Sequence, residues 1–485
     1  MFKLKTYKNQ KNNSDLFVQF LFYLFPVTFI IGNFIVSTHS IIFILVSLFL
    51  IKKRNLNLRF DKSYWLIIIF FIYLFLLSLF YFKLSGNVFD FLLERFDKKL
   101  ITTTANNSNE LIKIWFEENS DPSIKSFLLL RFILLVFVID TLIYNKIIDI
   151  KKFFLSCLIC TSFVSLDILL QYITEYDIFG YESKWEHNPG PFGDEYIAGS
   201  YLKNFSFLSI LFLYLNTKKN KNLIFGMVTI IHLVAMLVAG NRMPLILFIF
   251  GCFLIILFAK NIRFIMSLSI IIFISIFFLL AQNDDYVKKP YLTFFKNVNI
   301  FKVILNKQNQ KILKNNKEEA KSDEKILEEK EIVLLKSTGH NKVFRSAIET
   351  WKMQPITGFG LKSYRLKCPE IFVNDKILRE RNPLLFACGN HPHNYYLEVL
   401  SEAGIIGLIL IVIFFITLLK KSIKCLLKYN KESNKNFLIL LALTVTFFIE
   451  IWPIKSTGSF FTTWNATALW LNVGIIYSFI YYKKK

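Results

Sequence analysis

The feature that most constrains this chain is a series of apolar segments, each about as long as a membrane-spanning helix. Stretches of roughly 17 to 25 apolar residues recur along most of the sequence. Of the 485 residues, 54% are hydrophobic and 19% are charged, which is too apolar a balance for a soluble protein of this size. The bilayer must therefore be its solvent, and we predict an all-α polytopic membrane protein.

About twelve transmembrane helices are predicted. The first apolar run, 16–51, is about twice the length of one span and breaks at Gly32 and Asn33, so we interpret it as a tight hairpin of two helices. The other predicted spans are 64–82, 126–144, 153–173, 199–215, 223–239, 244–259, 264–281, 404–419, 436–453 and 466–482. Residues 1–281 thus hold helices 1–9, 282–403 form a long outward loop, and 404–485 hold helices 10–12.

The net charge of +23 could suggest nucleic-acid binding, but the placement of the basic residues decides against it. Lysine and arginine gather in alternate connections, at 3–11, 52–62, 151–152, 218–221, 260–263, 420–435 and 483–485. The connections 174–198 and 454–465 hold few of them. This positive-inside pattern predicts a multi-pass protein of a bacterial inner membrane with both termini in the cytoplasm. The first apolar run has no small-residue cleavage site, so no cleavable signal is expected.

The cysteines fall into two kinds of environment. Cys157 and Cys160 have CxxC spacing but lie inside an apolar span, where plain packing is favoured over metal or redox chemistry. Cys368 and Cys388 both fall in the outward loop, which is an oxidising place if it faces a periplasm. We therefore predict a disulfide between these two residues.

The loop 282–403 is far longer than an ordinary connection, and long ordered loops are usually functional. Its segment 306–336 mixes lysine and glutamate in near balance, which favours a solvated helix or flexible insert over a partner-binding role. Residues 341–353 repeat apolar side chains at helical spacing, which predicts an amphipathic helix. Pro355 should end this helix before a turn at Gly358 and Gly360.

The loop ends with Gly389-Asn390-His391-Pro392-His393-Asn394. Proline is favoured in a first helical turn, so we predict a helix that starts at Pro392 and carries His393 near its N-terminus. Nine residues after Asn394 comes Gly404, and Gly407 follows with two residues between them.

This spacing resembles the signature of the O-antigen ligase and Wzy-type polymerase superfamily, in which a His-Asn pair opens a helix before a Gly-x-x-Gly entry to the next span. Two further stretches resemble the same family. They are Ala239-Gly240-Asn241-Arg242 and Arg345 with Trp351, Pro355, Gly358 and Gly360 behind it. The resemblance covers about the last two-thirds of the chain, and the charged insert before Arg345 departs from it.

The resemblance implies glycan transfer from an undecaprenyl diphosphate carrier to an acceptor hydroxyl such as that of lipid A core, with no metal or other cofactor. The leaving diphosphate gains charge as its bond to the sugar breaks, and guanidinium groups can hold it bidentately. Arg242 and Arg345 are the candidates for this role. The alternatives are that Arg242 reaches the membrane interface and that Arg345 pairs with Glu349.

A hydroxyl is a poor nucleophile, so a residue able to take its proton near neutral pH is expected. The resemblance implies that His393 is this base, or orients the acceptor, with His391 and Asn394 in support. The alternative is a capping or structural histidine. A metal site that joins the two histidines to His187 or Cys388 is only weakly indicated, because no third ligand has a fixed spacing.

Three other sets of residues carry weaker indications. Asp194 and Glu195 lie in a Gly- and Pro-rich stretch that resembles one near the family's cavity, where they could orient the acceptor or pair with an arginine; a solvated turn is the alternative. Gly404 and Gly407 are expected to serve helix packing. Glu450, like Asp167 and His232, lies within a predicted span, where hydrogen-bonded helix packing is favoured over function.

Three functions remain open at this stage. A ligase is favoured over a polymerase that joins repeat units with nearly the same site. The third is a polysaccharide-lipid transporter or flippase, which would need a midplane site in two repeated halves. No such repeat is visible, and the motif residues gather at one membrane face. The expected partners are a polyprenyl-diphosphate-linked glycan, a glycan acceptor and membrane lipids.

Overall fold

The structure is a computed structural model, and it describes residues 13–81, 122–184, 187–283, 287–289, 291, 340–374, 387–429, 435–456 and 458–480. In this part of the chain the regular elements are helices, and the only β contacts are two isolated bridges, Tyr176 to Glu182 and Lys184 to His187. The predicted all-α fold class is confirmed. The predicted charged insert 306–336 lies outside the described residues.

The helices follow the chain in this order: α1 (Asn13–Tyr23), α2 (Phe25–Ile31), α3 (Asn33–Arg54), α4 (Tyr64–Tyr81), α7 (Pro122–Leu129), α8 (Arg131–Tyr144), α9 (Ile150–Thr174), η1 (Gly190–Phe192), α10 (Ala198–Asn216), α11 (Lys221–Val238), α12 (Arg242–Phe258), η2 (Lys260–Ile262), α13 (Arg263–Asn283), α17 (His340–Met353), α18 (Tyr364–Asn374), α20 (Tyr395–Tyr429), α21 (Lys435–Glu450) and α22 (Thr463–Ile480).

Each predicted span has a helix at its position. By length and hydropathy alone, seven described helices could cross a membrane, or eight if α1 and α2, bent by 46°, form one span. The other helices at predicted spans are α10, α12, α21 and α22, of which α12 is a shorter apolar helix. α10 and α22 lie inside the bundle, where polar groups such as Lys203 and Asn472 bond to protein instead of meeting lipid.

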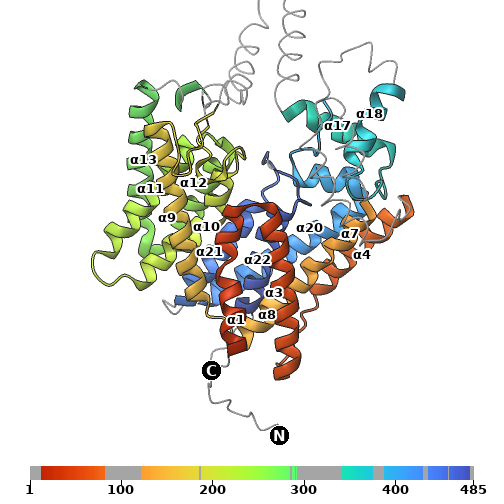
Figure 1. The fold of residues 1–485 in the computed structure, drawn as a ribbon, viewed down its shortest axis with the longest axis horizontal. Coiled ribbons are helices and arrows are strands. Elements are labelled where there is room, and N and C mark those ends of the chain that lie inside the picture. Colours follow the sequence, from red (N-terminus) through yellow and green to blue (C-terminus); the bar gives the residue numbers. More distant parts are fainter. Residues whose placement is uncertain are drawn as a thin grey trace, which may run out of the picture.

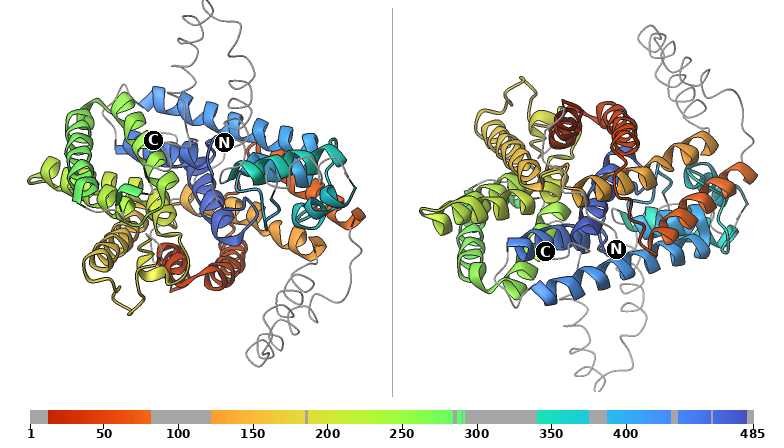
Figure 2. Two further views of the ribbon diagram at one scale, coloured as in Figure 1. Left: turned by 90° about the horizontal axis from the view of Figure 1, so that it is seen from above. Right: turned by 90° about the horizontal axis from the view of Figure 1, so that it is seen from below.

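The helices form two groups on either side of α22 (Figure 1). α9 to α13 lie on one side, and α4, α7, α17, α18 and the start of α20 lie on the other, an arrangement that Figure 2 shows from above and below. α22 packs along α8 and also against α3 and α21. α17 and α18 sit at the end of the molecule opposite the start of α1, next to the first turns of α20.

A break at Gly404 divides α20, which is otherwise continuous over 35 residues, because Gly404 has φ 62° and ψ −168°. The backbone N–H groups of Ile405 and Ile406 lose their helical acceptors there. They donate instead to the carbonyls of Pro355 and Ile356, at 3.0 and 3.3 Å. The turn that follows α17 therefore supplies the hydrogen bonds that the broken helix lacks.

The same two backbones meet at two further points. Gly360 N donates to the carbonyl of Glu402 at 2.8 Å. The hydroxyl of Tyr73, on α4, lies 3.0 and 3.1 Å from the carbonyl oxygens of Thr357 and Ala403. This contact, which we name the backbone crossing, joins the turn 355–360 to the Gly404 break and ties both to α4.

Only glycine fits at the centre of the backbone crossing. A Cβ on Gly404 would lie 2.2 Å from the carbonyl oxygen of Ile356, and one on Gly358 would lie 2.4 Å from that of Glu402. Both residues also have positive φ, a conformation that costs other residues energy. Gly404 thus acts through its backbone. A Cβ on Gly407 would lie 2.3 Å from the Cβ of Ala403, one turn earlier on α20, so this position leaves no room for a side chain either.

We predict that Gly404→Ala and Gly358→Ala each destabilise the protein by more than about 2 kcal/mol, since strain and a backbone clash act together. Thermal unfolding in detergent measures this. Gly389→Ala is the matched control, because a Cβ there meets no atom closer than 3.7 Å. Equal melting temperatures for Gly404→Ala and Gly389→Ala would contradict the assignment.

Candidate functional site

The N-terminus of α20 is fixed by the side chain of Asn394. Its Oδ1 accepts hydrogen bonds from the backbone N–H groups of Tyr396 and Leu397, at 3.0 and 3.1 Å, which is the geometry of a helix N-cap. The helix therefore begins at Tyr395, three residues later than predicted, since the cap forms at Asn394 and not before Pro392. The Asn394 amide also donates to the carbonyls of Pro453 and Lys455, at 2.8 and 3.1 Å.

Three histidine rings meet beside this cap. His393, in the left-handed backbone conformation with φ 55°, lies with its ring 4.2 Å from that of His391 and 4.6 Å from that of His340. His340 is the first residue of α17. We name His340, His391 and His393 the histidine cluster. Sequence reasoning missed His340, because it directly follows the charged segment and belongs to none of the motifs.

Burial decides the charge of His391. It lowers the pKa of this side chain to about 3, and the neighbouring His393, Lys362 and Arg365 act in the same direction. Burial also lowers the pKa of His340, again assisted by His393. His391 is therefore neutral at any working pH, and its buried Nε2 has no hydrogen-bond partner among the described residues. Because unfolding restores a pKa near 6.5, His391 makes folding less favourable as the pH falls from about 6.5 toward 3.

The two candidate arginines lie on helices that belong to different groups. Arg345 is half-buried on α17, five positions after His340, and Arg242 is the first residue of α12. In the described part of the chain, neither forms an ion pair with a carboxylate. Glu349, the alternative partner of Arg345, bonds instead to Lys352 at 2.8 Å. No described contact joins Arg242 to the histidine cluster.

Asp194 and Glu195 follow η1 in an exposed turn. Asp194 pairs with Lys184 at 2.5 Å, and its side chain is 80% exposed. The backbone N–H of Glu195 donates to the carbonyl of Phe192 at 3.2 Å. Within the described residues, neither carboxylate contacts a candidate arginine or the histidine cluster. Both residues therefore lie in an exposed turn, which is the alternative given in the sequence analysis.

A disulfide joins Cys368, on α18, to Cys388, with the two Cα atoms 5.8 Å apart. It ties the segment that leads into His391 to α18. His187 lies elsewhere, with its ring 4.6 Å from that of Tyr196. The described residues contain no group of three His, Cys, Asp or Glu side chains placed to hold a metal ion.

Two buried carboxylates follow on the first turns of α20. Glu398 accepts hydrogen bonds from Ser459 Oγ at 2.5 Å and from the backbone N–H of Phe460 at 2.6 Å. Glu402 accepts one from the backbone N–H of Lys362 at 2.7 Å, while the Lys362 ammonium lies 3.8 Å from Glu398. Sequence reasoning gave no role to Glu402 or Lys362. Together these bonds attach two separate loops to the helix that follows His393.

A buried ion network lies on the other side of Tyr395. The Tyr395 hydroxyl donates to Glu450 Oε1 at 2.5 Å, and Glu450 also pairs with Lys203 of α10 and with Lys455 at 2.9 Å. The Lys455 ammonium lies 4.0 Å from the centre of the Tyr395 ring. All four side chains are at least nine-tenths buried. The hydrogen-bonded packing predicted for Glu450 is thus an ion network that holds the start of α20.

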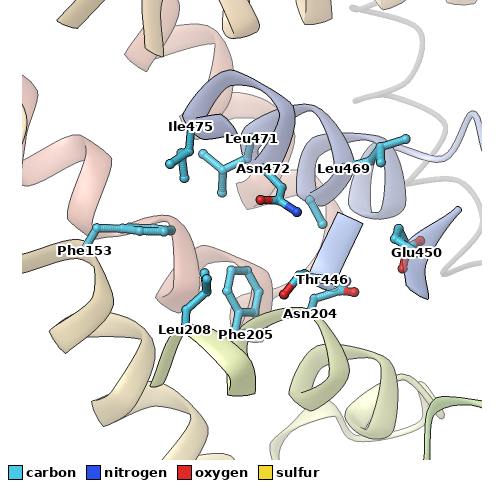
Figure 3. A pocket seen from close by; sticks show the side chains of 11 residues that line it. Phe153, Asn204, Phe205, Leu208, Thr446, Glu450, Leu469, Leu471, Asn472 and Ile475 are labelled. Atoms are coloured by element: carbon cyan, nitrogen blue, oxygen red, sulfur yellow. The ribbon is translucent and has the colours of Figure 1, made fainter. Parts of the chain in front are cut away.

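Glu450 also borders a small cavity, drawn in Figure 3, whose wall is mainly apolar. Asn204, Thr446 and Asn472 contribute polar groups to its wall. The Thr446 hydroxyl and the Asn472 amide oxygen are buried without partners in the described part of the chain. Ordered water molecules are the usual partners of such groups.

Residues 225–412 match a family model described as O-Antigen ligase. The matched segment contains both candidate arginines, the histidine cluster and the Gly404 break, whereas Asp194 and Glu195 lie outside it. This confirms the resemblance inferred from the motifs. It also supports a ligase- or polymerase-like role in a multi-pass membrane protein.

One curated relative is similar over part of its length. It is the exopolysaccharide production protein ExoQ of Rhizobium meliloti (strain 1021), 31% identical over 116 residues. The match covers 24% of this chain and 26% of that protein.

We predict that Glu450→Gln destabilises the protein by about 3–5 kcal/mol, because it leaves two buried lysines without a carboxylate. The double variant Lys203→Met/Glu450→Gln should recover part of this loss. Unfolding in detergent is the measurement, and Glu349→Gln is the control, since it breaks the more exposed pair with Lys352 and should cost no more than about 1 kcal/mol. Similar losses in Glu349→Gln and Glu450→Gln would refute the network.

We predict that reducing the disulfide lowers the stability of the wild-type protein by about 3 kcal/mol, as loop-closure entropy implies for a sequence separation of 20 residues. The measurement is thermal unfolding with and without dithiothreitol. The Cys368→Ser/Cys388→Ser variant should not respond to the reductant. Free thiols at both positions in oxidised membranes, found by mass spectrometry, would rule the bond out.

Proposed function

We propose that this protein transfers a glycan from an undecaprenyl diphosphate carrier to an acceptor hydroxyl at the periplasmic face of a bacterial inner membrane. The observation that carries the proposal is the placement of His393. It sits at the capped start of α20 beside a histidine that burial keeps neutral, and Arg345 lies on the adjoining helix α17. The proposed proton acceptor, His393, directly precedes α20, and the proposed cation, Arg345, lies on α17. These two helices pack against each other.

The reaction follows from these groups. The acceptor oxygen attacks the anomeric carbon, the bond from that carbon to the diphosphate oxygen breaks, and His393 takes the hydroxyl proton. Arg345 and Arg242 hold the diphosphate as its charge increases, since guanidinium groups stay protonated and bind two oxygens at once. His391 supports the site as a neutral ring 4.2 Å from that of His393, so it places no second positive charge beside the proposed base.

Two acceptors are compatible with this chemistry. Lipid A core would make the protein a ligase, which the description of the matching family supports. A second repeat unit would make it a polymerase, and the name of the exopolysaccharide relative supports this second candidate. The chain in proteoliposomes, given an undecaprenyl-diphosphate-linked glycan with and without lipid A core, separates them. Transfer to core indicates a ligase, chain growth without core a polymerase, and movement across the membrane without either product would refute the proposal.

We predict that His393→Gln lowers the transfer rate by about 10²- to 10⁴-fold while donor binding changes little, because a general base acts on the acceptor proton. Arg345→Ala and Arg242→Ala should instead weaken donor binding as well as turnover, and lysine should restore little, since a point charge cannot replace a bidentate group.

Lys352→Ala, on an exposed part of α17, is the control for general effects of mutation on that helix. Rates and donor affinities are measured at equal protein level in proteoliposomes. Near-wild-type transfer by His393→Gln would remove the catalytic assignment, whichever acceptor proves correct.

A further inference from the structure

Arg365, the second residue of α18, is a cation to which the proposed reaction gives no role. It is partly buried, and it makes no hydrogen bond or ion pair within the described part of the chain. Lys367, on the same helix, differs because it pairs with Glu370 at 2.8 Å. A guanidinium carries five N–H donors and stays charged at any working pH. Because charges in partly buried places are usually paired, the free donors of Arg365 suit an anion from outside the chain.

The disulfide places Arg365 beside the histidine cluster. α18 lies next to α17 and the start of α20 (Figure 1). Arg365 and Cys368 are three positions apart, so they share one face of α18. Cys368 is bonded to Cys388, which precedes His391 by three residues. Burial lowers the pKa of His391 most, and the positive charge of Arg365 adds to this effect, as expected of a cation close to the ring.

The two carboxylates at the start of α20 are bonded to other groups. Glu398 uses both oxygens to bind the loop 459–460, and the Lys362 ammonium lies 3.8 Å from it. Glu402 accepts a hydrogen bond from the backbone N–H of Lys362 at 2.7 Å. Neither carboxylate forms an ion pair with Arg365. Lys362 therefore has a carboxylate beside it, whereas the donors of Arg365 remain available to a ligand.

The position of Arg365 relative to the base selects the ligand. In a direct displacement at a sugar carbon, the attacking hydroxyl and the leaving group lie on opposite faces of the ring, and the base belongs to the attacking side. Arg365 is close to His391, whose ring lies 4.2 Å from that of the proposed base His393. Arg365 thus faces the acceptor and not the diphosphate. A bare cation there also opposes the positive charge that His393 gains with the proton, and an anion on the acceptor removes this opposition.

We propose that Arg365 binds an acidic group, a phosphate or a carboxylate, on the acceptor glycan, a proposal that rests on the function proposed above. A guanidinium forms charge-assisted, bidentate hydrogen bonds with either group. This contact orients the acceptor hydroxyl toward His393 and selects acidic over neutral acceptors. A phosphate points to a phosphorylated lipid A core, and a carboxylate points to an acidic sugar in a repeat unit.

The first experiment compares acceptors that differ in charge alone. In proteoliposomes with one undecaprenyl-diphosphate-linked donor, kcat/KM is measured for phosphorylated and dephosphorylated lipid A core. The same is done for a repeat unit that carries a uronic acid and for its carboxyl-reduced form. We expect Arg365→Gln to lower kcat/KM about 10- to 100-fold for the acidic member of one pair, which is the size of one charged hydrogen bond, and to leave its neutral partner unchanged. The pair that responds identifies the acidic group.

Lys367→Gln is the matched control, since it removes from the same helix a cation that is already paired with Glu370. It should leave every acceptor unchanged. Arg365→Lys should recover only part of the loss, because a point charge replaces a bidentate group. Equal losses with acidic and neutral acceptors would show a structural role only. That result, unchanged rates with both pairs, or weaker donor binding by Arg365→Gln would each overturn the proposal.

The second experiment needs no transfer. The wild-type protein in vesicles without donor is treated with phenylglyoxal, which modifies arginine, and the modification of Arg365 is followed by mass spectrometry. The acidic acceptor should slow this modification, and its neutral form should not. Equal protection by both forms, or an Arg365 that the reagent cannot reach, would overturn the proposal. Protection by the acidic acceptor alone, in a protein that transfers no glycan, would instead refute the proposed function.

Discussion

The arrangement of the candidate site depends on the backbone crossing between the Gly404 break and the turn 355–360. Each buried N–H or carbonyl left without a partner costs about 1–3 kcal/mol, so a break in a buried helix is stable only if another segment completes its hydrogen bonds. The turn after α17 does so for Ile405 and Ile406. Because α17 also carries His340 and Arg345, the same bonds that repair α20 set the distance between these residues and His393.

His393 itself is held by neighbours that come from several parts of the chain. A non-glycine residue with positive φ is uncommon and persists where its surroundings leave it no alternative. The Asn394 cap fixes the backbone on one side of His393, and the disulfide ties the preceding segment to α18 on the other. Tyr395, bonded to Glu450, prevents the first turn of α20 from shifting. The candidate site is therefore supported by bonds from residues that have no part in the proposed chemistry.

Much of the fold followed from hydropathy, because a membrane-spanning helix needs a long apolar stretch whatever its neighbours are. The sequence also indicated His393, Arg345 and the turn at Gly358, since these depend on local spacing. It could not pair Lys203 with Glu450, because 247 positions separate them and only packing of α10 against α21 brings them together. His340 was not identified because only the packing of α17 against α20 brings it to His393. The start of α20 was predicted three residues too early because the helix is capped by the Asn394 side chain and does not begin at Pro392.

The length of α20 has a consequence for which acceptors can react. Its 35 residues would measure about 52 Å as a straight helix, whereas the hydrocarbon core of a bilayer is about 30 Å thick. The helix is therefore longer than the apolar layer, and the break at Gly404 separates its first turns from the long remainder. Because the Asn394 cap fixes His393 at the start of this helix, the proposed reaction requires a sugar hydroxyl that stands at the height of His393 above its own lipid anchor.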